Sequence, residues 1–154
     1  MREIKFNKQG IEAILNGSKT MTRRPLTDLE MLDYNSWLEP EYFSKYKVGE
    51  TVELAEVYEN NPNNEWRLTG REVKIINIKV ERLQDISEED CIKEGGEVAC
   101  LSCDDLAIDC KCIESEHDNH KDIFRYDIWN FTPYKSPYDW NSNPYVFIYE
   151  FEVV

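Results

Sequence analysis

The fold of this protein is indicated first by the stretch Ile14–Arg24, which reads ILNGSKTMTRR. Upstream of it, Asn7 is a typical helix cap, and the apolar residues that follow recur with the i, i+3, i+4 spacing of one helical face. Gly17 is typical of a helix end. The next residues, Lys19–Arg24, are expected to be extended as far as Pro25, which disfavours a helical residue before it. We therefore predict a helix, a glycine turn and a short strand.

The predicted strand has two chemically different faces, because side chains alternate along extended backbone. One face carries Lys19, Met21 and Arg23, and the other carries Thr20, Thr22 and Arg24. Taken by itself, this composition favours a solvated edge strand that uses charge to discourage pairing with another chain.

Three later segments have the pattern of strands. Val73–Leu83 is rich in Ile and Val, and Thr51–Tyr58 follows a glycine turn. In Tyr145–Val153 every odd position is apolar, while Glu150 and Glu152 fall on the other face, which predicts a half-buried strand. Strands separated by short helices and irregular connections favour an α+β barrel over a parallel doubly wound sheet.

Helical signals are weaker in the rest of the chain. Ser87–Asp90 has the form of a capping box, with Ile86 and Cys91 placed to form a hydrophobic staple, so Cys91 is predicted to pack rather than to bind metal. Residues 120–131 have the pattern of an amphipathic helix. Residues 26–47 show little periodicity, and we expect a long loop there that could include a helical turn.

Length and composition predict a single domain over residues 1–154. The chain is 41% hydrophobic, which is too apolar for a disordered protein. No apolar run approaches the roughly 20 residues that span a bilayer, and the N-terminus lacks a signal-peptide pattern, so a cytoplasmic location is expected.

Charge is distributed unevenly along the chain. The net charge is −13, yet residues 1–25 hold six basic and two acidic side chains. An acidic protein of this kind is not expected to coat long duplex DNA. A local basic patch formed by the basic side chains of residues 1–25 could still hold one nucleotide or a short strand.

Ile14–Arg24 resembles the signature I-L-x-G-x-K-T-x-T-x-R of the ASCH-domain family, which belongs to the PUA-like superfamily. Further stretches are similar to the phage and prophage branch of that family, in the same order along the chain. They are Tyr46–Glu50, Val80–Asp90, Ile128–Asn130 and Trp140–Val146.

The resemblance implies a PUA-like β-barrel with a cleft beside the Lys-Thr segment, in a superfamily associated with RNA and modified nucleosides. One ASCH branch consists of amidohydrolases that remove the acyl group from N4-acetylcytidine. The resemblance maps the catalytic Lys, Thr and Glu of that branch onto Lys19, Thr22 and Glu94. Thr20, Arg23 and Arg24 are expected to contribute to substrate binding.

Three functions are compatible with these observations. The first is a non-catalytic module that binds RNA or a nucleotide, and the second is an amidohydrolase for N4-acylated cytidine or a similar amide. The third is a phage protein that engages a host protein through its acidic surface. Tight nucleoside binding without turnover would indicate the first, and a stoichiometric protein partner without nucleic-acid binding would indicate the third.

A cysteine cluster is expected to form an insertion of about residues 97–120 in the domain. Cys100, Cys103, Cys110 and Cys112 are four thiols within 13 residues, and His117 or His120 could replace one of them. Four thiolates can close a tetrahedral zinc site, and Cys-x2-Cys is a common half of one. We expect a structural zinc ion here. Reduced surface thiols in a loop are the alternative.

Overall fold

The structure is a computed structural model, and it describes residues 1–58, 62–63, 65–95, 124–129 and 134–154. Its strands are β1 (Glu3–Phe6), β2 (Met21–Pro25), β3 (Thr51–Val57), β4 (Trp66–Arg82) and β5 (Tyr145–Val153). Its α-helices are α1 (Lys8–Leu15), α2 (Asp28–Asn35), α3 (Pro40–Phe43) and α4 (Glu88–Lys93). Two further helical turns are Leu83–Asp85 and Phe124–Trp129.

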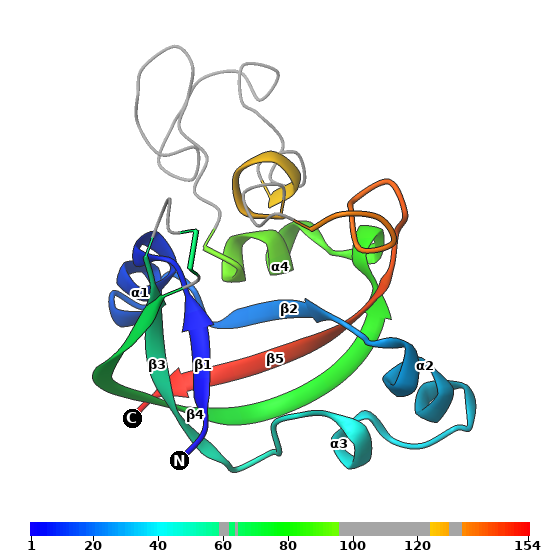
Figure 1. The fold of residues 1–154 in the computed structure, drawn as a ribbon, viewed down its shortest axis with the longest axis horizontal. Helices are drawn as coiled ribbons and strands as arrows, with labels where there is room; N and C mark the ends of the chain where they lie inside the picture. Colours follow the sequence, from blue (N-terminus) through cyan, green and yellow to red (C-terminus); the bar gives the residue numbers. More distant parts are fainter. Residues whose placement is uncertain (59–61, 64, 96–123, 130–133) are drawn as a thin grey trace.

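All five strands belong to one sheet, in the order β1-β3-β4-β5-β2. Only β1 and β3 are parallel, and the other neighbours are antiparallel. The sheet curls strongly, so that β1 and β2, its two edges, approach each other (Figure 1). Register shifts between Glu53 and Ala55 and between Ile75 and Asn77 accompany this curl, as β-bulges increase local bending.

The α+β fold with a curled sheet agrees with the sequence-based prediction. The prediction was a β-barrel, whereas the observed sheet is a half-barrel. The edges are linked by a side chain: the Arg24 guanidinium on β2 donates a hydrogen bond of 2.7 Å to the Lys5 carbonyl on β1. The inner face of the sheet packs around a core that includes Ile4, Tyr149 and Phe151.

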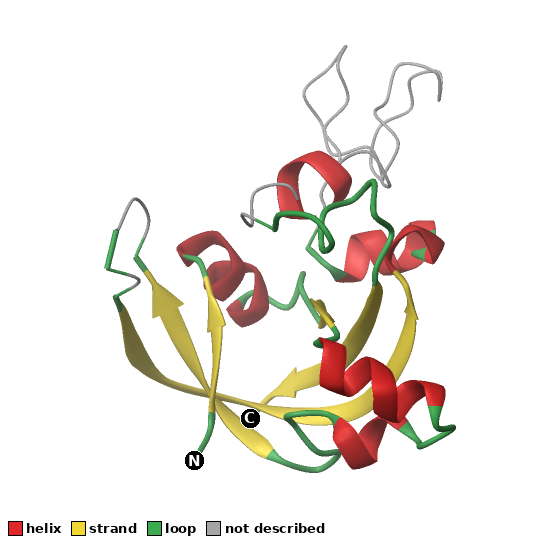
Figure 2. Cartoon of the chain, turned by 45° about the vertical axis from the view of Figure 1, so that its right-hand side comes forward, coloured by secondary structure: helices red, strands yellow, loops and turns green. Residues whose placement is uncertain are grey.

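A second core lies on the opposite face of β5 and β2. It joins Ile148 and Met21 to Ile86, Cys91 and residues of the Phe124–Trp129 turn. Helix α4 and this turn lie on that side of the sheet in both views (Figures 1 and 2). For this reason β5 is buried on both faces over much of its length, rather than half-buried as its alternating pattern predicted.

Helix α1 and the capped helix α4 form as predicted. The Asn7 side chain accepts a hydrogen bond from the Gly10 N–H, and the Ser87 side chain accepts one from the Asp90 N–H. Cys91 is buried beside Ile86, as the hydrophobic staple requires. Of residues 120–131, the described part is the turn Phe124–Trp129, in which Phe124 and Trp129 are buried.

The prediction of a long loop over residues 26–47 is wrong. This segment contains α2 and α3, which pack against the sheet near β5. Thr27 and Glu30 form a reciprocal capping box at the start of α2. The S/T-x-x-E signal was therefore present in the sequence, but the helix lacks a one-sided apolar pattern, because apolar residues occupy two of its faces.

Candidate functional site

The candidate site forms where the end of α4 meets the chain just before β2. The Thr20 N–H donates to the Lys93 carbonyl at 2.8 Å, and Lys19 and Glu94 form an isolated antiparallel bridge. Gly95 follows with φ +93°, and a Cβ on it would lie 3.4 Å from the Lys19 Cβ. Glycine therefore both ends the helix and allows Lys19 to pass closely.

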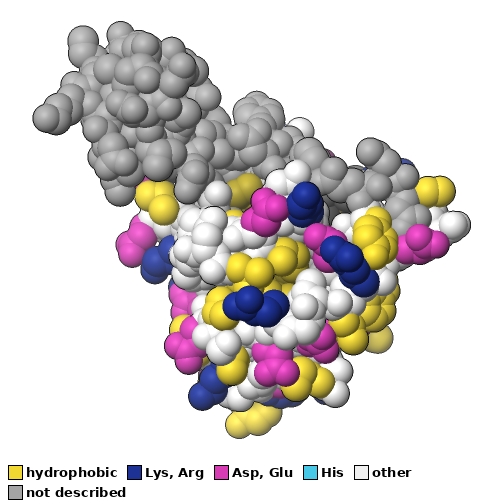
Figure 3. All heavy atoms as spheres, turned by 90° about the vertical axis from the view of Figure 1, so that its left-hand side faces the viewer, with side chains coloured by type: hydrophobic (Ala, Val, Ile, Leu, Met, Phe, Trp, Pro, Cys, Tyr) yellow, Lys and Arg dark blue, Asp and Glu magenta, His cyan; other side chains and the backbone are white. Residues whose placement is uncertain are grey.

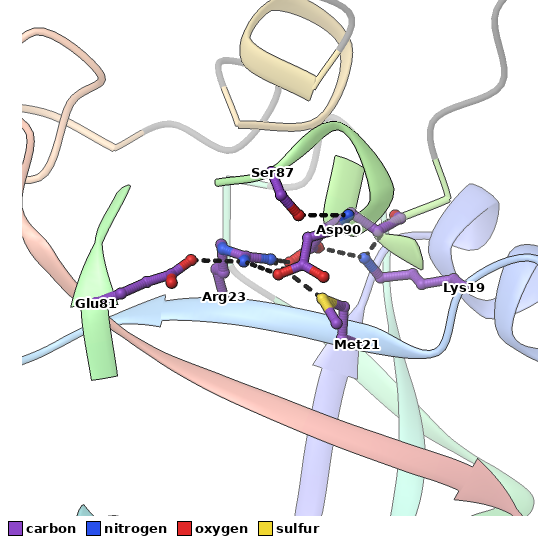
Figure 4. Close-up of polar contacts among 7 residues, drawn as sticks. Lys19, Met21, Arg23, Glu81, Ser87 and Asp90 are labelled. Carbon is purple, nitrogen blue, oxygen red and sulfur yellow. Dashed lines mark hydrogen bonds and ion pairs between the residues drawn. The ribbon is translucent and has the colours of Figure 1, made fainter. Parts of the chain in front are cut away.

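This backbone contact brings together two of the residues predicted from the resemblance, Lys19 and Glu94. The Lys19 ammonium donates to the Glu94 carboxylate at 2.9 Å and to the Glu94 carbonyl at 2.8 Å (Figure 4). Glu94 caps the C-terminal end of α4, where a cation is favoured because the helix carbonyls point outward.

Arg23 is the centre of the surrounding ion-pair network. Its guanidinium donates to the carboxylates of Glu94 at 2.8 Å, Glu81 at 2.8 Å and Asp90 at 2.9 Å. Figure 4 shows this group between β2, α4 and the end of β4. Lys19 and Arg23 supply two positive charges and the three carboxylates supply three negative ones, so the network carries a net charge of −1 when all are ionised.

The inner part of the network is almost completely buried. The side chains of Lys19, Glu94 and Arg23 are 7%, 2% and 1% exposed. Burial lowers the pKa of the Lys19 ammonium, the Glu94 carboxylate opposes this shift, and the nearby Arg24 and Arg23 add to the lowering. Burial also acts to lower the pKa of Arg23, but its carboxylate partners outweigh burial and raise that pKa. Lys19 is thus easier to deprotonate than an ordinary lysine.

Thr22 and Arg24 lie on the other face of β2. Thr22 is buried opposite Tyr149 of β5, and Arg24 lies opposite Phe147. Among the described residues, no hydrogen bond joins the Thr22 hydroxyl to Lys19 or Glu94. The structure therefore pairs Lys19 with Glu94 directly but leaves Thr22 outside their hydrogen-bonded network.

Phe6 of β1 contacts both Lys19 and Arg24. The Phe6 ring centroid lies 5.8 Å from the Lys19 Nζ and 4.9 Å from the Arg24 guanidinium carbon. The Nε of Arg24 is buried and has no hydrogen-bond partner. This face of β2 therefore holds a buried donor and an aromatic ring near the Lys19 ammonium.

The other predicted site residues have less specific surroundings. The Thr20 side chain is exposed, while its backbone is held by Lys93 and by Phe151 of β5. Cys100, Cys103, Cys110 and Cys112 lie outside the described residues, as do His117 and His120. Within the part of the chain that the structure describes, no cluster of His, Cys, Asp and Glu side chains could hold a metal ion.

Two of the six basic residues counted in residues 1–25, Lys19 and Arg23, do not form a basic surface patch. Lys19 and Arg23 are buried against carboxylates and do not face solvent. On the face seen in Figure 3, Lys and Arg side chains lie beside hydrophobic ones and are interspersed with Asp and Glu. In the structure as a whole, cation–π contacts place Lys5 over Trp66 and Arg24 over Phe6.

Three residues of the site were missed by the sequence analysis: Phe6, Glu81 and Asp90. Asp90 was interpreted only as part of a capping box, and its position in the first turn of α4 gave no sign of a contact with Arg23. Glu81 and Phe6 occupy strand positions of ordinary composition. No local pattern distinguishes them, because their contacts with the site arise only from the curl of the sheet.

Comparison with known proteins shows similarity at the level of the fold. The protein EF3133 from Enterococcus faecalis V583, of the family DUF984, matches over 100% of this chain and 76% of its own, with 14% identity and a TM-score of 0.51. The two chains share a fold. The likeness is one of fold alone, at 14% identity.

Two other solved structures match with lower scores. An ASCH domain from Lactobacillus crispatus JV V101 has 14% identity and a TM-score of 0.42, over 99% of this chain and 79% of that one. The hypothetical protein PH0355 has 16% identity and a TM-score of 0.45, over 100% of both chains. No family model and no curated protein sequence matches the chain. Among the described residues, no helix is long and apolar enough to cross a membrane.

Proposed function

We propose that this chain is an ASCH-type, PUA-like domain of the phage and prophage branch that binds RNA or a modified nucleotide beside β2. The observation that carries the proposal is the buried network of Lys19, Arg23 and Glu94. Such a network is weak evidence for stability, because removing charges from water costs about as much as their pairing returns. Buried, perturbed ionisable groups are instead common at functional sites.

The ligand's base, rather than its phosphates, is expected to provide most of the recognition. Lys19 and Arg23 are already neutralised by carboxylates, and the network as a whole carries a net charge of −1. Arg24 has a buried N–H without a hydrogen-bond partner, and a buried donor of this kind usually has one. A nucleobase that binds beside β2 can accept this hydrogen bond.

Calorimetry with cytidine, N4-acetylcytidine, cytidine monophosphate and a short single-stranded RNA tests this proposal. The wild type should bind at least one of them, and Arg24→Ala should weaken binding by about tenfold or more, because a charge-assisted hydrogen bond contributes about 1.5–3 kcal/mol. Lys79→Ala, which removes an exposed lysine from β4, is the matched control and should bind as wild type.

Salt dependence refines the same experiment. A ligand held through its base should lose at most about tenfold in affinity between low and physiological salt, whereas many phosphate contacts would cost about 10³-fold or more. A wild type that binds none of the compounds in the panel would contradict the proposal. So would an Arg24→Ala variant that is folded and binds with unchanged affinity.

A second candidate, amide hydrolysis, is favoured by one specific observation. The pKa of Lys19 is lowered by burial, so its neutral amine forms at a lower pH than that of an ordinary lysine. In this mechanism the Thr22 hydroxyl oxygen attacks the acyl carbon of an N4-acylated cytidine, and Lys19 accepts the hydroxyl proton. The C–N bond breaks as the cytosine nitrogen takes that proton. Water then hydrolyses the Thr22 ester to a carboxylic acid and restores the threonine.

We also propose that Cys100, Cys103, Cys110 and Cys112 bind one structural zinc ion, with His117 or His120 as a replacement ligand. The donor spacing supports this proposal, since four thiolates suit tetrahedral zinc. Protein purified with reduced thiols and without chelators should carry about one equivalent of zinc by elemental analysis. Chelation should leave the curled sheet folded by circular dichroism. Metal-free protein from such a preparation would contradict the proposal.

A further inference from the structure

The segment from α2 to α3 exposes an unusual number of large apolar side chains. Trp37 is 94% exposed and Tyr42 is 77% exposed, and Leu29, Leu32 and Leu38 are also exposed. Scattered exposed apolar residues are normal on protein surfaces, but this many within 14 residues is not. We call these five residues the apolar patch.

Helix α2 is apolar on two opposite faces. Met31 and Tyr34 point to the core, and the Tyr34 ring lies 5.1 Å from that of Tyr145. Leu29 and Leu32, three residues apart, share the opposite face, which is turned away from the sheet. A helix that is apolar on both sides normally buries both. One of the two faces of α2 is exposed.

Helix α3 repeats this arrangement next to α2. Phe43 packs on Phe147 at 5.5 Å between ring centroids, while its neighbour Tyr42 is exposed. Both views show α2 and α3 side by side at one end of the curled sheet (Figures 1 and 2). The exposed side chains of the two helices are therefore available to one partner.

Trp37 is presented by a backbone conformation that is uncommon outside glycine. It follows the end of α2 with φ 64°, and its N–H donates to the Tyr34 carbonyl at 3.1 Å. A left-handed conformation costs a non-glycine residue about 1–2 kcal/mol. The largest side chain of the patch is thus held outward at some cost in stability, and tryptophan is the residue most enriched among anchors of protein interfaces.

The segment that carries the patch is acidic, although Lys45 and Lys47 follow it and the Lys47 ammonium donates to the carbonyls of Glu41 and Ser44. Residues 26–44 contain five carboxylates and no Lys or Arg. The carboxylates belong to Asp28, Glu30, Asp33, Glu39 and Glu41. Such a rim repels nucleic-acid phosphates and anionic lipid headgroups, and it attracts Lys and Arg.

We infer that the apolar patch docks a protein partner whose contact surface is an apolar groove or face bordered by Lys and Arg. This surface is separate from the candidate site at Lys19 and Glu94. The apolar side chains supply the buried contact, and the carboxylates select a basic partner and orient it. The inference is independent of the proposed nucleotide binding, so either can fail without the other.

A pair of synthetic helical peptides tests this inference. Both have leucines along one face, and the other positions are lysine in one peptide and glutamate in the other. Fluorescence anisotropy should show that the full-length protein binds the lysine peptide at least about tenfold more tightly than the glutamate peptide. Trp37→Ser and Leu32→Ser should each weaken binding of the lysine peptide by about tenfold.

Ile76→Ser is the matched control, because it removes an exposed apolar side chain from β4, outside the patch. It should bind the lysine peptide as wild type does. All three variants should keep the wild-type melting temperature, since they change exposed positions. Equal binding of the two peptides, or unchanged binding by Trp37→Ser and Leu32→Ser, overturns the inference. Self-association of the wild type that Trp37→Ser abolishes, or patch-dependent binding to RNA or to anionic vesicles, also overturns it.

Discussion

Replacing Arg23 by alanine is expected to lower the free energy of unfolding by about 3–5 kcal/mol. The Glu94 carboxylate is 2% exposed and depends on Arg23 and Lys19 for compensation of its charge. Without Arg23, the carboxylates of Glu81, Asp90 and Glu94 also come together with one fewer cation. Urea unfolding at neutral pH, followed by circular dichroism, measures the loss.

Arg67→Ala is the matched control for this prediction. Arg67 pairs with Glu56 at 2.9 Å, but its side chain is 63% exposed, so its removal should cost no more than about 1 kcal/mol. The double variant Arg23→Ala with Glu94→Gln should lose less stability than the two single changes added together, because each single change removes the same pair. Equal losses for Arg23→Ala and Arg67→Ala would contradict a structural role for the buried network.

Lys19→Ala is expected to reduce release of acetate from N4-acetylcytidine by at least about 100-fold if the site is hydrolytic. Thr22→Ala should reduce it as strongly, because it removes the nucleophile. Lys19→Arg should be as inactive as Lys19→Ala, since a guanidinium stays protonated and cannot accept the hydroxyl proton. Chromatographic separation of cytidine from its acetylated form measures the rate, and Lys79→Ala again serves as the control.

The pH dependence of the same reaction gives a separate test of the role of Lys19. Its pKa is lowered from 10.5, mainly by burial, so the rate should rise with pH and level off before that value. The free energy of unfolding should also rise with pH over this range. Between the lowered pKa and 10.5 the unfolded chain binds more protons at Lys19 than the folded chain does, so this group's contribution to the free energy of unfolding rises with pH.

Two results would count against hydrolysis. One is the absence of acetate with the wild type, and the other is a Lys19→Ala variant that is as active as the wild type. If nucleotide binding is then still lost in Arg24→Ala, the site binds without turnover. The calorimetric and hydrolytic experiments therefore separate the two proposed functions.

Much of the local structure could be predicted from the sequence because it depends on neighbouring residues. The Asn7 cap, the Gly17 turn and the alternation along Lys19–Arg24 each require only a few consecutive residues, and the structure contains all three. The contact between Lys19 and Glu94 was expected only from the family resemblance. No local pattern relates two residues that are 75 positions apart.

The tertiary structure alone decided what Arg23 does. Its three carboxylate partners lie 58 to 71 residues away in the sequence, and the curl of the sheet and the docking of α4 bring them to it. The sequence predicted a local basic patch over residues 1–25, because a count along the chain does not include the distant carboxylates that pair with Lys19 and Arg23 in the fold. Folding buries Lys19 and Arg23 against carboxylates. Alternation along β2 already predicted that Arg23 lies on one face and that Thr22 and Arg24 lie on the other. Only the packing of α4 on the Arg23 face shows that this face holds a buried ion network, while Thr22 and Arg24 lie on the inner face of the curled sheet.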